Sequence, residues 1–163
     1  MAVTLKLSAN LRITKKRKGN KMLLDLETLF SDAQAITTSA ASTNIVKMAN
    51  TEHNMPEVAF GTPMPLIIQV VEDFAGATSV AASIQTSAAE DFSSPKTLVS
   101  SGDIPIADLK TGYKFPINYI PKGNLGYMRV YYDVKGASGA GTATGGKITA
   151  GMVAAHDNSY QDM

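Results

Sequence analysis

The alternation of apolar and polar residues between Pro63 and Thr86 constrains the fold of this chain more than any other feature. Apolar residues recur at every second position on both sides of a polar tip at Glu72–Gly76, which is the period of a half-buried β-strand. The positions expected to face the core are Leu66, Ile68, Val70, Thr78, Val80, Ala82, Ile84 and Thr86. The opposite face of the second limb holds only small or uncharged side chains, Ser79, Ala81, Ser83 and Gln85. We therefore predict a β-hairpin with one face in the core and an outer face suited to cover by a neighbour.

A second alternating stretch predicts another hairpin further along the chain. Its first limb carries Tyr113, Phe115, Ile117 and Tyr119, and Pro121–Asn124 is a four-residue turn. Pro116 places the first limb near a sheet edge or a bulge, because proline cannot donate to a ladder. In the second limb, one face is expected to hold Met128, Val130, Tyr132 and Val134, and the other Tyr127, Arg129, Tyr131 and Asp133.

Shorter strands are predicted at Asn44–Met48, Lys96–Ser100, Asp103–Ile106 and Lys147–Val153, with loops at Ala49–Pro56 and Gly136–Gly146. Leu26, Leu29, Phe30 and Ala33 match helical spacing, whereas the Thr/Ser-rich continuation from Ile36 favours strand or loop. The pattern as a whole predicts an all-β fold, a jelly-roll-like β-sandwich of about eight antiparallel strands with at most one short helix and an extended N-terminal arm.

The formal net charge of +1 conceals two oppositely charged regions. Residues 1–21 carry a net charge of +7 and residues 22–163 a net charge of −6. We predict a basic arm at residues 1–21, a jelly-roll domain at 22–157 and a polar tail at 158–163. The cluster Lys15, Lys16, Arg17, Lys18 and Lys21 is suited to an acidic protein surface or, non-specifically, to phosphates. No aromatic residue lies among these charges to stack a base, so we expect a protein-contacting or solvated arm and no specific nucleic acid.

Charged residues make up 18% of the chain, against about 25% in typical soluble domains. A surface poor in charge costs little to desolvate, which suits a subunit that packs against neighbours, although an ordinary small-residue-rich β domain explains the figure as well. The chain has no cysteine, which excludes disulfides and thiolate sites. Its apolar runs are too short for a membrane helix, and residues 1–21 lack the features of a secretory signal. We expect no membrane partner.

Each candidate catalytic motif lacks a residue or a structural context that its chemistry requires. The run from Gly141 to Lys147 has the glycine and lysine spacing of a phosphate-binding P-loop, but Ile148 replaces the required Ser or Thr and a strand is expected to follow. His53 and His156 are far apart in sequence, with no His-x-His pair for a metal and no Ser-His-Asp arrangement. The acidic pairs Glu72–Asp73 and Glu90–Asp91 fall at predicted turns, where solvated charge is expected. We expect no enzyme activity, no metal and no cofactor.

Three segments in order, LFSDAQAITTSAASTNIV (Leu29–Val46), PEVAFGTPMPLIIQVVEDF (Pro56–Phe74) and GYMRVYYDV (Gly126–Val134), resemble the capsid cement, or decoration, proteins of tailed bacteriophages. The resemblance covers roughly residues 22–155 and leaves residues 1–21 as either an added arm or the result of an upstream start choice. It implies a jelly-roll homotrimer without catalytic residues, made in the host cytoplasm. It also implies a place on the exterior of an icosahedral head, where the protein bridges major capsid subunits and stabilises their contacts.

An alternative is a jelly-roll recognition module, carbohydrate- or receptor-binding, in a phage tail or surface protein. Tyr127 and Tyr131 lie on one expected strand face and are suited to present their rings to a sugar. The same two side chains are better suited to packing at a sheet or subunit interface.

Overall fold

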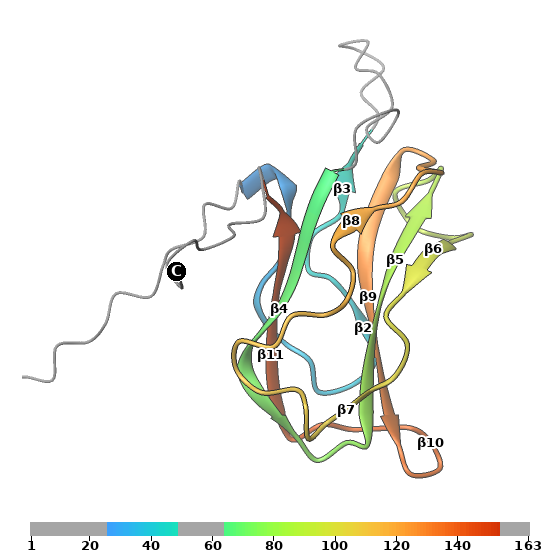
Figure 1. Ribbon diagram of the computed structural model, residues 1–163. Coiled ribbons are helices and arrows are strands. Elements are labelled where there is room, and N and C mark those ends of the chain that lie inside the picture. Colours follow the sequence, from blue (N-terminus) through green and yellow to red (C-terminus); the bar gives the residue numbers. More distant parts are fainter. Residues whose placement is uncertain (1–25, 49–63, 154–163) are drawn as a thin grey trace, which may run out of the picture.

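Two antiparallel β-sheets packed face to face form the part of the chain that the computed structural model describes, residues 26–48 and 64–153 (Figure 1). The all-β sandwich predicted from the sequence is confirmed. The basic arm with Lys15, Lys16, Arg17, Lys18 and Lys21, the loop Ala49–Pro56, both histidines and the polar tail lie outside the described residues, as do the predicted domain boundaries.

The first sheet has four strands in the order β1 (Leu29–Ala35), β11 (Gly145–Met152), β4 (Met64–Ala75) and β8 (Tyr119–Ile120). The second is built around β9 (Tyr127–Gly136) and β5 (Ser79–Ser87), which pair without a register shift. Shorter strands complete this second sheet: β2 (Ala40–Ala41), β3 (Val46–Lys47), β6 (Lys96–Ser100), β7 (Ile104–Pro105) and β10 (Gly139–Ala140). These eleven strands of the described residues exceed the predicted eight through additional two-residue strands, and one of these, β10, lies inside the predicted loop Gly136–Gly146.

The core lies between the two sheets and consists of the predicted strand faces. Ile68 and Val70 of β4 and Val80, Ala82 and Ile84 of β5 are at most 1% exposed. β9 contributes Met128, Val130, Tyr132 and Val134, all fully buried, and β11 contributes Ile148 and Ala150. Thr78 is the exception among the predicted inward positions, because it lies in the turn before β5 and is exposed.

The two predicted hairpins are wrong in one respect, because the limbs of each belong to opposite sheets. β4 pairs with β11 and β8, whereas β5 pairs with β9, β6 and β7. Likewise β8 pairs with β4, and the Pro121–Asn124 connection carries the chain over to β9. A strand with one buried face alternates in the same way whether its neighbour in sequence lies beside it or across the core. The polar tip is also displaced, since β4 continues to Ala75 and the chain turns at 76–78.

The helix predicted around Leu29 is wrong, because Leu29–Ala35 is a strand preceded only by the 3-10 turn η1 (Leu26–Thr28). Two register shifts interrupt the pairing of β1 with β11, and Ala33 has a φ of 44°. Leu29, Phe30 and Ser31 are consequently buried in succession. These bulges displace the apolar residues from the two-residue period, which explains the resemblance to helical spacing.

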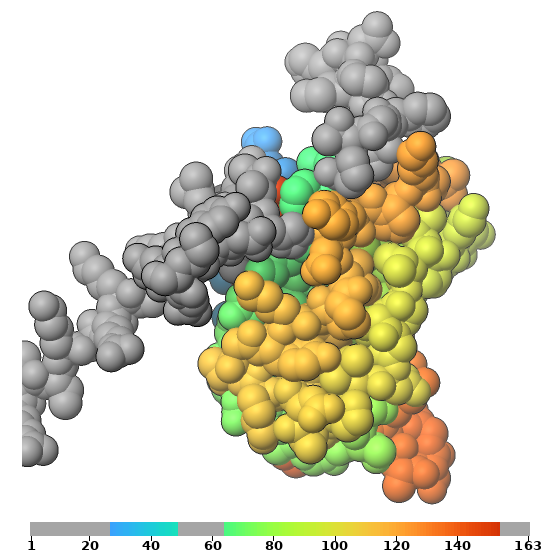
Figure 2. All heavy atoms as spheres, in the orientation of Figure 1, coloured from blue at the N-terminus to red at the C-terminus, as the bar shows by residue number. Residues whose placement is uncertain are grey.

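The segment between β6 and β8 closes one open side of the sandwich (Figures 1 and 2). Its buried side chains are Leu109, Phe115 and Ile117. It follows the outer edge of β4, to which Phe115 N donates a hydrogen bond at Ile68 O, but only Gln69 and Lys114 form a β-bridge. The alternation predicted for Tyr113–Tyr119 is thus present in the burial of its side chains up to Ile117, but only the end of this segment forms a regular strand. Pro116 lies in a bend and not in a strand, next to Phe115, which bonds to the edge of β4. No helix among the described residues is long and apolar enough to cross a membrane.

Candidate interaction surface

The outer face of the paired strands β5 and β9 carries several of the residues predicted to point outward. β9 alternates buried and half-buried positions along its length, and the half-buried ones point outward. The register places Ser83 opposite Tyr131 and Gln85 opposite Arg129. Ser83 and Gln85 therefore lie on this surface as predicted, whereas Ser79 and Ala81, which were also expected to face outward, are buried. β9 adds aromatic and charged side chains to the surface. We call this surface, formed by Ser83, Gln85, Tyr127, Arg129 and Tyr131, the β5–β9 face.

Arg129 is held at the centre of the β5–β9 face by three side chains. Its guanidinium carbon lies 4.2 Å from the ring centroid of Phe92 and 5.9 Å from that of Tyr131. Its Nε donates a hydrogen bond of 2.9 Å to Gln85 Oε1. Partial burial lowers the pKa of Arg129, and Arg129 remains fully protonated at neutral pH. Within the described ranges, no carboxylate lies within ion-pair distance of this cation.

Phe92 comes from residues 88–95, which join β5 to β6, and the sequence analysis did not identify it. The side chain is 5% exposed and the residue adopts a φ of 50°. Asp91 Oδ1 accepts a hydrogen bond from Ser93 N, which fixes the turn around it. The only sequence feature that pointed to Phe92 was its position directly after the predicted turn at Glu90–Asp91.

The charges at the other end of the same sheet compensate one another. Lys135 Nζ lies 2.8 Å from Asp103 Oδ1 and 4.0 Å from Asp133 Oδ2, and the hydrogen bond to Asp103 raises the pKa of Lys135. Asp133 also accepts a hydrogen bond from the Ser39 hydroxyl. Unlike these groups, Arg129 has no ion-pair partner among the described residues.

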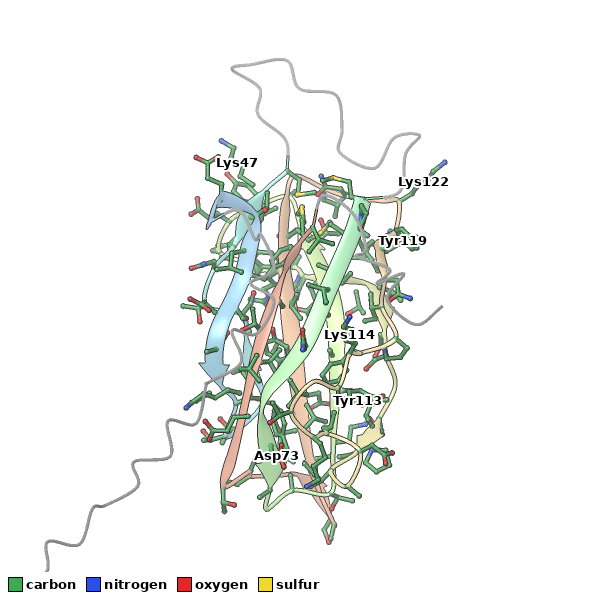
Figure 3. The ribbon with its side chains drawn as sticks, turned by 60° about the vertical axis from the view of Figure 1, so that its left-hand side comes forward. Lys47, Asp73, Tyr113, Lys114, Tyr119 and Lys122 are labelled. Atoms are coloured by element: carbon green, nitrogen blue, oxygen red, sulfur yellow. The ribbon has the colours of Figure 1, made fainter. Side chains whose placement is uncertain are left out.

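Exposed apolar side chains gather at the end of the sandwich where β3 and β8 lie. Tyr119 is 52% exposed, Leu125 48% and Ile45 41%. Lys47 and Lys122 lie at the same end as Tyr119, and Asp73 lies at the opposite end (Figure 3). The pairing of Leu29 with Gly151 and of Met64 with Ile120 brings the boundaries of the described ranges to this end. Residues 1–25, 49–63 and 154–163 therefore all attach here.

The described residues considered for catalysis lie in strands and in one turn. Lys147 lies in β11 and pairs with Glu72, and a strand follows it, as predicted. Glu72 and Asp73 belong to β4 and not to a turn, which corrects that prediction. Glu90 and Asp91 do lie in a turn. Among the described residues, no three His, Cys, Asp or Glu side chains group as metal ligands.

A family model matches most of the chain. No curated protein is similar to the chain. The Bbp16 family model matches residues 30–152, a range that includes almost every strand of both sheets and leaves out residues 1–29. The chain therefore belongs to the Bbp16 family, a phage-related protein family.

Proposed function

We propose that this protein is a non-catalytic virion structural protein, a capsid cement protein that binds the outside of an icosahedral head and stabilises contacts between major capsid subunits. Membership of a phage-related family supports the phage origin. The observation that carries the proposal is Arg129, held between Phe92 and Tyr131 on the β5–β9 face without a carboxylate partner in the described part of the chain.

The β5–β9 face has the composition of a protein interface. Arginine and tyrosine are the residues that most often dominate binding energy at such interfaces. Because Phe92, Tyr131 and Gln85 already restrict the Arg129 side chain, little conformational entropy remains to be lost on binding. The small side chains of β5, such as Ser83, allow a partner to approach closely. We propose an acidic region of the major capsid protein as the partner.

Self-association would strengthen such binding without additional contacts. In a homotrimer, three weak contacts act together, since binding of the first copy raises the effective concentration of the others near the head to about the millimolar range. A trimer would thus dissociate far more slowly than a single copy.

The decisive experiment incubates purified protein with heads that lack it, sediments the heads and measures the bound ratio. Binding is expected to saturate at a fixed ratio to the major capsid protein. Arg129→Ala should weaken binding by at least about tenfold, the range of interface hot spots. Lys114→Ala, which removes an exposed cation beside β4, is the matched control and should bind normally. Absence of co-sedimentation of the wild-type protein would contradict the proposal.

The contribution of the basic arm is tested by deleting residues 2–21 and measuring occupancy on the same heads. If the arm anchors the protein, its deletion should reduce occupancy at physiological salt, and the size of this reduction should depend on ionic strength. Unchanged occupancy would rule out the arm as an anchor.

A carbohydrate- or receptor-binding module is the second candidate function. Tyr127 and Tyr131 both point outward from β9 and flank Arg129, an arrangement that also suits a sugar ring. Saturable binding on a glycan array, lost in Tyr127→Ala and accompanied by no binding to heads, would favour this function over the first.

A further inference from the structure

A groove of about 630 Å³ lies at the end of the sandwich where the described chain begins. Three parts of the chain form it: the residues around the start of β1, the segment that leads into β3, and the connection between β5 and β6. The lining residues are Glu27, Leu29, Thr43, Asn44, Ile45 and Glu90. Neither the family match nor the proposed function assigns a role to it.

Hydrogen bonds of Asn44 hold the shape of the groove. Asn44 Nδ2 donates to Leu29 O at 3.0 Å, and Asn44 N donates to Phe30 O at 2.9 Å. The Ser42 hydroxyl donates to Asn44 O at 2.8 Å. These bonds tie the segment before β3 to β1 and fix the position of one wall of the groove.

The lining combines apolar surface with negative charge. Ile45 is 41% exposed and Leu29, which also lines the groove, is 6% exposed, whereas Glu27 and Glu90 are both exposed carboxylates. No lysine or arginine of the described residues lines the groove. A lysine or arginine side chain fits such a surface, because its aliphatic stem covers apolar atoms while its charged end reaches a carboxylate.

We propose that this groove binds the basic segment Lys15–Lys21 of the same chain. Lys21 precedes Leu26 by five residues, which span at most about 17 Å, and Leu26 adjoins Glu27. A segment tethered so closely has an effective concentration in about the millimolar range, so weak ion pairs suffice within one chain but not between dilute chains. The segment carries five of the seven positive charges of residues 1–21. Docking would therefore partly neutralise the arm until a more acidic partner competes for it.

Zero-length carbodiimide cross-linking tests this inference, because it joins a carboxylate to a lysine amine only where the two are in contact. The full-length protein is mixed in equal amounts of ¹⁴N- and ¹⁵N-labelled forms, cross-linked at low concentration and analysed by mass spectrometry. We expect cross-links from Glu27 or Glu90 to lysines of Lys15–Lys21, joined within chains of one isotope. Mixed-isotope cross-links, or none to these lysines, would overturn the proposal.

Tryptic cleavage within Lys15–Lys21 provides a second measurement. The double variant Glu27→Gln, Glu90→Gln should be cleaved about three- to tenfold faster than wild type, as expected for the loss of exposed ion pairs. Asp108→Asn removes an exposed carboxylate near the opposite end, where Leu109 O accepts a hydrogen bond from Phe74 N, and should leave the rate unchanged. Equal rates for all three proteins would contradict docking. Neither measurement involves heads, so its failure would leave the cement proposal untouched.

Discussion

Gly146 shows how a single residue sets the packing between β11 and β4. Its φ is +132°, and a Cβ atom at this position would overlap the ring of Phe74, which is 2% exposed. Glycine thus allows the ring to lie directly against the backbone of the neighbouring strand.

We expect Gly146→Ala to lower the free energy of unfolding by about 2–4 kcal/mol, through backbone strain combined with overpacking. Gly139→Ala is the matched control, because Gly139 also has a positive φ, +118°, but a Cβ atom there would meet nothing within 4 Å. Its cost should be about 1 kcal/mol. Urea denaturation measures both values, and equal costs would show that the Phe74 contact is unimportant.

Tyr132 provides a second prediction at the residue scale. Its hydroxyl lies 2.9 Å from Ser31 Oγ inside the core, and the Ser31 proton is donated to Gln34 Oε1. The Tyr132 hydroxyl is therefore the donor to Ser31. Tyr132→Phe should lower the free energy of unfolding by about 1 kcal/mol at pH 7, the usual net value of one hydrogen bond.

Burial raises the pKa of Tyr132 above its ordinary value of 10.0, so the folded state favours the neutral phenol. This contribution to stability is complete below pH 10 and is lost as the pH rises above it, because the unfolded tyrosine ionises first. Between about pH 9 and pH 11, Tyr132→Phe should therefore reduce the loss of stability. Identical pH profiles for wild type and Tyr132→Phe would contradict this account.

At the scale of strands, the residues that face the core could be predicted from the sequence, but the neighbour with which each strand pairs could not. Val80, Ala82 and Ile84 are buried as their spacing indicates, because alternation records only which face meets the core. Alternation carries no information about whether β4 pairs with β5 or packs across from it. The bulges of β1 concealed a strand for a related reason, since each inserted residue reverses the inward and outward positions.

For the β5–β9 face, too, the direction of the side chains could be predicted from the sequence but their contacts could not. The outward direction of Arg129 followed from its position in β9, whereas its contact with Phe92 depends on how a non-periodic connection folds back over the sheet. No local sequence pattern specifies such a contact.

Asp73 anchors the segment between β7 and β8 to the end of β4, which leads to a prediction at the element scale. Its Oδ1 accepts hydrogen bonds of 2.7 Å from both Thr111 N and Thr111 Oγ1, with Lys110 Nζ 3.7 Å from Oδ2. The backbone hydrogen bond from Thr111 is the main cause of the lowered pKa of Asp73. The anchor is therefore fully present above the unfolded pKa of an aspartate and is lost as the pH falls through the lower folded value.

In NMR spectra, the Thr111 amide signal should titrate with a midpoint below 3.8. Asp73→Asn should speed hydrogen exchange of that amide at neutral pH. Asp91→Asn is the control, because its carboxylate accepts a hydrogen bond from Ser93 N and should affect only that region. A Thr111 amide that neither titrates nor exchanges faster would rule out the anchor.

At the scale of the whole molecule, strands from both ends of the described chain lie side by side. Leu29 of β1 pairs with Gly151 of β11, and the hydrophobic core includes residues of both sheets. Such non-local pairing predicts slow folding, in about milliseconds to seconds, as a single cooperative transition. Stopped-flow refolding and calorimetry measure this, and two separate thermal transitions would contradict it.

The adjacency of β1 and β11 also determines how the sandwich responds to force. Because the strands are antiparallel, the start of one and the end of the other lie at the same end of the sheet. Tension applied through these two points would unzip the pair, because the hydrogen bonds between the strands would break one after another. Unzipping resists force less than shearing, in which all the bonds bear the load together. The start of β1 and the end of β11 are therefore points at which pulling loads the bonds of this strand pair one at a time.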